Sequence, residues 1–234
     1  MEPKLIYLAR RNPALTRSGF TARWRQHGAL GMSMPRWKNI RRYVHCDVQQ
    51  YGISGIDEGY DGVGLIWHRS PEARSRHRSD NSSQAQMEAD EAQTFAEPVY
   101  NFCLLAQEFV LKDGLAGAVK LIHFAERATL LGKKEFEKAW RESHTNALLG
   151  DSEIGPAIQR YVQNHALPPE RPGGWGLTSD CVDEFWFAPA ENLPSVFARL
   201  KAETQGSDLL RRSIWVATNE VVLHDRPEIA LGPD

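Results

Sequence analysis

The sequence lacks the features that mark secreted and membrane-spanning proteins. Its 234 residues include only three cysteines, Cys46, Cys103 and Cys181. An odd number of cysteines without a CxxC pair gives no disulfide framework, so we expect a reducing, cytoplasmic compartment. No stretch approaches the roughly 18 apolar residues of a membrane span, and the N-terminus has no long apolar run of the signal-peptide kind. We therefore expect no membrane partner.

The sequence also lacks the short motifs of metal and nucleotide sites. It contains no HExxH, no Walker A motif and no GxGxxG. Its eight histidines are scattered without metal-ligand spacing, so we expect no metal and no cofactor. With 28 basic and 30 acidic residues, the net charge of −2 gives no basic surface for nucleic acid. The basic cluster at 74–78 runs into the polar stretch DNSSQ, and we interpret it as a solvated loop.

What the sequence does contain is an internal repeat with a period of about 115 residues. The segments FTARWRQHGAL (20–30) and FEKAWRESHTNAL (136–148) carry Phe, Trp and His in the same order. Three further segments recur in order: KLIYLARR (4–11) as KLIHFAER (120–127), RYV (42–44) as RYV (160–162), and QEFVLKD (107–113) as NEVVLHD (219–225). We interpret this as a duplication and predict two units, residues 1–114 and 115–234, joined by the linker KDGLAGA at 112–118.

Each copy has the order strand, helix, strand, strand, helix, strand, which is the ferredoxin-like plan. In the first copy the first helix is opened by Thr16 or Ser18, and in the second copy by Gly132. The second helices are expected at about 83–97 and about 190–205.

The expected strands are apolar on both faces, as Leu5 and Tyr7 against Ile6 and Leu8 show. Both faces of each sheet therefore need cover. We predict an α+β fold in which two tandem ferredoxin-like βαββαβ units pack sheet to sheet as an intrachain pseudo-dimer and close a barrel.

The repeated Phe, Trp and His form one stripe on a helix. At about 100° per residue, Phe136, Trp140 and His144 share a face. The first copy has one residue fewer before its histidine, but the same three side chains still face one way: Phe20, Trp24 and His27. Phe and Trp are expected to pack on the sheet. Each histidine either bonds the next loop or lines a cavity between helix and sheet and moves protons.

These motifs resemble the EthD family of the dimeric α+β barrel superfamily. The pattern F-x3-W-x3-H, then RYV-Q-N-H, then D-x-V-x-E-x-W-F lies in residues 136–187, and residues 20–68 carry a degraded version. The resemblance implies a pair of ferredoxin-like units, usually in two chains but here in one. Relatives in the superfamily include cofactor-free isomerases, dehydratases and decarboxylases, polyketide-tailoring enzymes and some haem-handling oxygenases. Since fold does not fix function, the site must be argued separately.

Several polar and aromatic side chains on the expected strands are candidates for a site. Tyr7 and His123 occupy equivalent places on the first strand of each copy, and each is a bonded core residue or an acid/base group. His45 shares a strand face with Tyr43, and Tyr161 is the equivalent of Tyr43. The remaining candidates are His68 for proton transfer and Trp24, Trp67, Trp140 and Trp186 as core residues or substrate-binding platforms.

Three further features have two readings each. Asp61 and Asp180 begin strands, where they more readily fix a turn than carry chemistry. Glu184 is either a structural partner of Arg160 or a general base. The loop GGWG (173–176) is a lid or a plain connector.

Two functions remain open from the sequence. The first is a cofactor-independent lyase or isomerase that moves protons on a small aromatic or apolar metabolite, with catalytic histidines drawn from His27, His45, His68, His123 and His144. The second is a binding module for a small ligand or haem, with His27 or His144 as an axial ligand. The sequence does not show which half holds the site, and the protein is expected to be a monomer or a homodimer.

Overall fold

The computed structural model describes residues 2–117, 119–170, 172–188 and 193–226. Within these residues the strands are β1 (Lys4–Ala9), β2 (Ile40–Val48), β3 (Gly62–His68), β4 (Cys103–Lys112), β5 (Val119–Arg127), β6 (Ile158–Ala166), β7 (Cys181–Phe187) and β8 (Leu210–Asp225). They close one antiparallel barrel in the order β1-β3-β2-β8-β5-β7-β6-β4. Ala118, the end of the predicted linker, lies outside the described residues.

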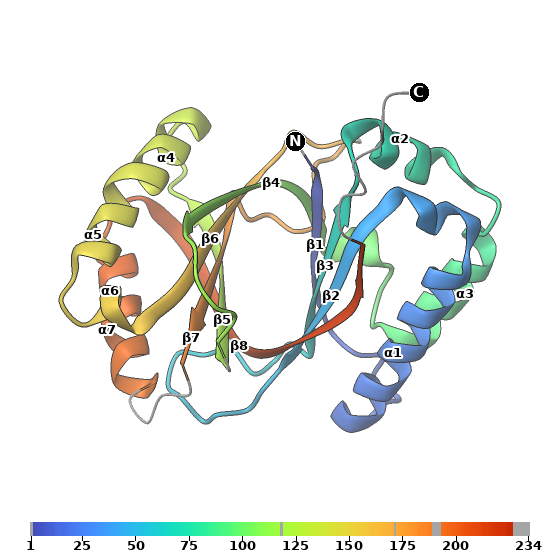
Figure 1. Ribbon diagram of the computed structural model, residues 1–234, viewed down its shortest axis with the longest axis horizontal. Coiled ribbons are helices and arrows are strands. Elements are labelled where there is room, and N and C mark those ends of the chain that lie inside the picture. The colour runs from blue at the N-terminus through green and yellow to red at the C-terminus, as the bar shows by residue number, and fades with distance from the viewer. Residues whose placement is uncertain (1, 118, 171, 189–192, 227–234) are drawn as a thin grey trace.

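The helices form two layers outside the barrel (Figure 1). The layer of the first half, residues 2–117, contains α1 (Arg17–Ser33), η1 (Pro35–Asn39), α2 (Pro71–Ser79), α3 (Gln84–Thr94) and η2 (Val99–Phe102). The layer of the second half, residues 119–226, contains α4 (Lys133–Ala139), η3 (Trp140–His144), α5 (Thr145–Gly150), α6 (Ile154–Ala157) and α7 (Leu193–Gln205). No helix in the described ranges has the length and apolarity to cross a membrane.

The prediction of two tandem ferredoxin-like units packed sheet to sheet is wrong. The eight strands form one continuous closed barrel, and the fold is α+β in composition. The reason lies in the edge strands, which bond across the halves instead of ending two separate sheets. β2 pairs with β8 from Arg42 to Val48, and β4 pairs with β6 from Ala106 to Lys112. Closing the barrel gives hydrogen-bond partners to the edge-strand N–H and C=O groups, which two open sheets would leave unpaired. A division of the chain at residue 114 stays a prediction.

The expected burial of both strand faces is confirmed. Ile6 and Leu8 lie in the barrel interior with Val44, Leu65 and other apolar side chains. Tyr7, on the opposite face of β1, packs with Phe20 and Trp24 under α1. The helical layers therefore cover the outer face, and the interior side chains cover one another.

Local capping matches the sequence signals. Thr16 is the N-cap of α1, and its hydroxyl accepts a hydrogen bond from the Gly19 backbone N–H at 3.1 Å. Gly132 precedes α4 in the same role without a side-chain bond. Asp61 and Asp180 fix turns as expected, because they accept bonds from the backbone N–H groups of Arg11 and Arg127 at 2.9 and 3.0 Å.

The extra residue of the second copy produces a π-helical turn. η3 spans Trp140–His144, where the ladder widens to absorb one inserted residue. The insertion keeps Phe136, Trp140 and His144 on the buried face of the helix. This explains how a spacing of eight residues there and of seven in α1 yields the same stripe.

Candidate functional site

A cavity lies between the helical layer of the first half and the outer face of its strands. This inner chamber has a volume of about 130 Å³. Its walls come from three sources: Tyr7 and Tyr43 on the strands, His27 and Gly31 on α1, and Met87 and Glu91 on α3. Apolar side chains, including Leu5, Ile66 and Trp37, complete it. The chamber is close in size to the roughly 150 Å³ apolar cavity that binds benzene in an engineered protein.

A larger surface depression adjoins the inner chamber. This outer groove has a volume of about 610 Å³, and Arg36, His77 and Glu91 line both spaces. Gly174 and Trp175, from the GGWG loop of the second half, form part of its wall. Trp175 is fixed by a 2.7 Å bond from its indole N–H to the Leu167 carbonyl. The GGWG loop is therefore a wall of the groove, and its role as a lid stays a prediction.

Two tyrosine hydroxyls form a hydrogen-bonded chain at the floor of the chamber. The Tyr7 and Tyr43 hydroxyl oxygens lie 3.0 Å apart, and the Trp24 indole N–H donates to the Tyr7 hydroxyl at 3.0 Å. Burial raises the pKa of both tyrosines, so the hydroxyls stay protonated at neutral pH. The Tyr7 ring needs the absence of a side chain at Gly64, where a Cβ would lie 1.9 Å from the ring.

His27 is held by a carboxylate on the neighbouring helix. Its Nδ1 lies 2.6 Å from Asp90 Oδ2. Because a carboxylate only accepts, Nδ1 carries the proton and Nε2 keeps its lone pair in the neutral ring. Burial lowers the pKa of His27, although Asp90 acts in the opposite direction. Burial alone would raise the pKa of Asp90, but hydrogen bonds from Arg23 and His27 bring it below its usual value. His27 is thus an oriented, neutral base on the chamber wall.

His45 lies beside the chamber and does not line it. Its ring stacks on Trp24 at 3.6 Å, and its Nδ1 lies 2.6 Å from Arg25 Nη1. Because a guanidinium only donates, Nδ1 of His45 is the acceptor and its lone pair is engaged. Burial and the Arg25 charge hold the pKa of His45 well below its usual value. His45 therefore packs against Trp24 and has a structural role. Its engaged Nδ1 and low pKa make it a poor base for a ligand.

His68 belongs to a cluster at the edge of the outer groove. Its ring meets His77 edge to face at 5.3 Å, and its Nε2 lies 3.5 Å from Arg74 Nη1. Burial and Arg74 hold the pKa of His68 well below its usual value. The interpretation of residues 74–78 as a solvated loop is wrong, since they lie in α2. Arg74 pairs with Glu170 there, and burial lowers the pKa of His77 to about 4.

In the second half the equivalent groups are enclosed by one another. His123 bonds Asp183 at 3.0 Å and the Ser213 hydroxyl at 2.6 Å, so both its ring nitrogens are engaged. Asp183 also accepts bonds from Trp140 and Tyr161. In the repeat, Asp183 occupies the place of Gly64, so a carboxylate fills space that the first half leaves to Tyr7.

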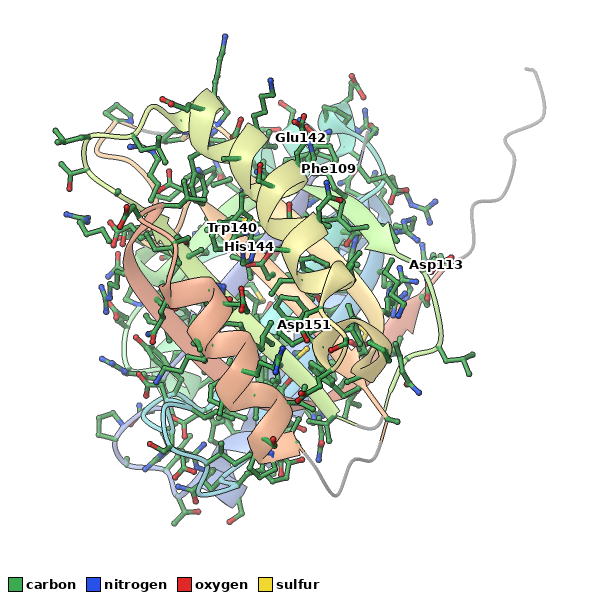
Figure 2. The ribbon with its side chains drawn as sticks, turned by 90° about the vertical axis from the view of Figure 1, so that its left-hand side faces the viewer. Phe109, Asp113, Trp140, Glu142, His144 and Asp151 are labelled. Carbon is green, nitrogen blue, oxygen red and sulfur yellow. The ribbon has the colours of Figure 1, made fainter. Side chains whose placement is uncertain are left out.

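Aromatic side chains fill the rest of the second helical layer. Trp215 stacks on His123 at 4.0 Å and packs against Phe185 and Phe197. His144 stacks on Trp140 at 3.7 Å, and burial lowers its pKa to about 4. Figure 2 shows Trp140 and His144 side by side under this layer. The second half therefore looks like a packed core, whereas the first half has a chamber.

Trp67 and Trp186 lie in neither helical layer. Both point into one mouth of the barrel, and each ring carries a lysine ammonium, Lys4 at 4.2 Å and Lys120 at 4.3 Å. Glu184 bonds these two lysines, whereas Arg160 pairs with Asp113. The predicted pairing of Glu184 with Arg160 is therefore wrong.

The sequence did not single out four residues that shape the site: Arg36, Trp37, Asp90 and Glu91. Asp90 is 63 residues from His27 and has no motif around it, so only the packing of α3 on α1 brings the two together. Glu91 lines both spaces, and burial raises its pKa. In the described part of the chain, no group of three or more His, Cys, Asp or Glu residues is arranged to hold a metal ion.

Comparison with known protein families gives a match to part of this chain. Residues 12–98 match the model of the EthD domain. The match includes every chamber residue named above except Leu5 and Tyr7, and it falls on the half in which the sequence motif is less complete. A search of curated protein sequences finds no match.

Solved structures extend the comparison to the whole chain. An anthrone oxidase-like protein has a TM-score of 0.61 at 12% identity, over 99% of this chain and 97% of its own. A chlorite dismutase variant from Candidatus Nitrospira defluvii has a TM-score of 0.53 at 10% identity, over 93% of this chain and 91% of its own. At these identities the likeness concerns the fold alone, so any function must be argued from this chain's own residues.

Proposed function

We propose that the inner chamber binds a small aromatic or apolar metabolite and that His27 moves a proton on it without a cofactor. The observation that carries the proposal is the His27–Asp90 pair, because His27 lines the same chamber as the Tyr7–Tyr43 hydroxyl pair. A base with an orienting carboxylate and a neutral hydroxyl donor can carry out proton transfer next to a carbonyl. The EthD match covers His27, Tyr43 and Asp90 and supports the assignment.

The roles follow from the protonation states. Nε2 of neutral His27 accepts a proton from a carbon next to a carbonyl group of the substrate. One hydroxyl of the Tyr7–Tyr43 pair donates to the other, and the second donates a hydrogen bond to the carbonyl oxygen on which negative charge develops. His27 then returns the proton to another atom, which gives an isomerisation, or to a leaving hydroxyl, which gives a dehydration. In a carbon–carbon cleavage His27 instead takes the proton of a hydroxyl group, the bond from that carbon to the carbon next to the carbonyl breaks, and His27 returns the proton to the carbon of the resulting enolate. Asp90 stabilises the imidazolium between the two transfers.

Substrate size follows from the two spaces. A chamber of about 130 Å³ holds a single ring, and its Ile66, Trp37 and Met87 side chains favour an apolar one. The rest of the molecule lies in the outer groove, past Arg36 and His77. The alternative of a haem module fits poorly, because the chamber next to His27 is smaller than the roughly 300–1,000 Å³ of pockets for drug-sized ligands.

The test compares two histidines at matching places in the repeat. The protein is incubated with a set of small aromatic ketones, enols and alcohols, and products are detected by mass spectrometry. On a substrate so found, His27→Gln is expected to lower kcat/KM by about 10²–10⁴-fold, because general acid/base groups contribute about that much. His144→Gln, in the packed second half, is the matched control and is expected to leave kcat/KM unchanged.

The pH dependence of kcat/KM provides a second test of His27 as the base. Because burial lowers the pKa of His27, the residue is neutral at pH 7. We expect kcat/KM to stay level from pH 8 to 6.5 and to fall as the pH drops below the usual value of 6.5 and His27 gains its proton. Full turnover in His27→Gln, or equal losses in both histidine variants, would contradict the proposal.

A further inference from the structure

One mouth of the barrel holds a second pocket, remote from the inner chamber. This barrel mouth has a volume of about 260 Å³ and shares no lining residue with the chamber. Its walls are made by pairs of residues that match in the repeat: Arg42 and Arg160, Trp67 and Trp186, Glu108 and Glu220. Glu184 has no such counterpart, because the first half carries Leu65 at its place.

The floor of the barrel mouth is a buried ionic network. The Lys4 ammonium lies 2.8 Å from Glu108, and the Lys120 ammonium lies 2.6 Å from Glu184 and 2.7 Å from Glu220. Lys4 also pairs with Glu184. Burial alone would lower the pKa of Lys120, but Cys46 and the Glu184 and Glu220 carboxylates raise it well above its usual value. Lys120 is therefore a cation that is held in place, not a free amine nucleophile, and Lys4 is held by Glu108 and Glu184.

Cations outnumber anions in the lining and floor of the barrel mouth. The cations are Lys4, Lys120, Arg41, Arg42 and Arg160, and the anions are Glu108, Glu184 and Glu220. The rim adds three carboxylates, Glu2, Asp225 and Asp113, which pair with the three arginines. The Asp113 side chain is 81% exposed and that of Asp225 is 44% exposed, so solvent screens both pairs and an incoming anion can displace them.

Two donors in this pocket lack a partner among the described residues. They are the Trp186 indole N–H and the Nε–H of Arg42, both buried. The indole N–H of Trp67, the repeat equivalent of Trp186, donates to Glu108 at 3.2 Å. Only the indole of the second half therefore lacks an acceptor in this pocket. Trp186 is only 6% exposed. A buried donor without a partner destabilises the folded protein, and an acceptor in the pocket would remove that cost.

We infer that the barrel mouth binds a small organic monocarboxylate, whose oxygens accept hydrogen bonds from the Trp186 indole and from Arg42. Arg160 faces the same space from the other half and adds a second guanidinium. Guanidinium–carboxylate pairing favours a carboxylate over a spherical anion. The site is independent of the proton-transfer function proposed for the inner chamber.

The test uses benzoate as the probe and its neutral analogue benzamide as the control. The indole N–H resonance of Trp186 is assigned in the proton NMR spectrum of the whole protein by its loss in Trp186→Phe. In chloride buffer, benzoate is expected to shift this resonance in a saturable manner, and benzamide is not. Arg42→Gln and Arg160→Gln are each expected to weaken benzoate binding about tenfold, the effect of one charge-assisted hydrogen bond.

Two control variants make the outcome decisive. His27→Gln, in the inner chamber, is expected to bind benzoate as the wild type does. Arg211→Gln removes an exposed arginine elsewhere and reports any loss through net charge alone. The inference is overturned if benzoate leaves the Trp186 resonance unmoved, if it shifts the Trp24 and Trp37 resonances instead, or if Arg211→Gln weakens binding as much as Arg42→Gln.

Discussion

Replacing Glu184 with leucine is expected to lower the free energy of unfolding by about 3–5 kcal/mol, the usual cost of removing one partner from a buried ion pair. The Glu184 side chain is 1% exposed and lies between two buried ammonium groups, Lys4 and Lys120. Without it, the two cations face each other in the barrel with one carboxylate fewer between them. Leucine is the matched replacement, because the repeat places Leu65 at the equivalent position.

Thermal and urea denaturation measure this effect. For a chain of this length a loss of 1 kcal/mol lowers Tm by about 2–4 °C, so Glu184→Leu should melt roughly 10 °C earlier. Asp113→Asn removes an ion pair whose carboxylate is 81% exposed and is expected to cost less than about 1 kcal/mol. Adding Lys4→Met to Glu184→Leu should restore part of the loss. A Glu184→Leu variant as stable as the wild type would show that the network contributes nothing.

The same network predicts how stability depends on acid. Burial alone would raise the pKa of Glu184, but the charges of Lys120 and Lys4 bring it to about 2, below the usual 4.5. A group with a lowered pKa in the folded state stabilises the protein at neutral pH. That contribution is lost as the pH falls from 4.5 towards 2, and Glu184→Leu should lose less stability than the wild type over this range.

Replacing Gly31 with leucine is expected to abolish ligand binding in the inner chamber while the protein stays folded. A Cβ at Gly31 would lie 3.7 Å from the Trp37 ring and 4.0 Å from the Met87 methyl, which is ordinary contact. Both neighbours line the chamber, so the leucine methyl groups would occupy its volume. The repeat offers a precedent: four residues after the histidine, the second half carries Leu148, fully buried, where the first half has Gly31.

The expected sizes of these effects separate binding from stability. Turnover should fall by about 100-fold or more, since displacement of a substrate by 1 Å can cost that much. Stability should hold or rise by up to about 1 kcal/mol, because glycine is a poor helix former. Leu148→Ala is the complementary control: it should lower stability by about 2–5 kcal/mol and leave the kcat/KM of the folded protein unchanged. Normal turnover in Gly31→Leu would rule out the chamber as the site.

The sequence predicted the parts of the fold that depend on local patterns. The Thr16 cap and the stripe of Phe20, Trp24 and His27 follow from residue spacing, and the structure confirms them. The two-sided burial of β1 follows from its lack of polar alternation. The hydrogen-bonding of edge strands across the two halves did not follow, because the pairing of β2 with β8 connects residues 170 to 183 positions apart.

The site was predictable only in part, for a related reason. Tyr7, His27 and Tyr43 stood out by residue type, and the structure brings them to one chamber. Asp90 and Arg36 did not, because nothing near them in the chain marks them as partners. His123 and His144 carry the same types as the chamber residues, but Asp183 and Trp215 fill the space around them. Residue type alone identified the candidate site residues. Whether neighbouring side chains leave space beside a candidate then decides whether it can contact a ligand.

The most direct test of the inner chamber as the active site is a crystal structure of the protein with a bound substrate or product of the reaction. Electron density for the ring of that molecule is expected between α1 and the β1–β3 face, within hydrogen-bond distance of His27 Nε2 and of the Tyr7 or Tyr43 hydroxyl. Density found only under α4 and α7, or only in the barrel mouth, would contradict it.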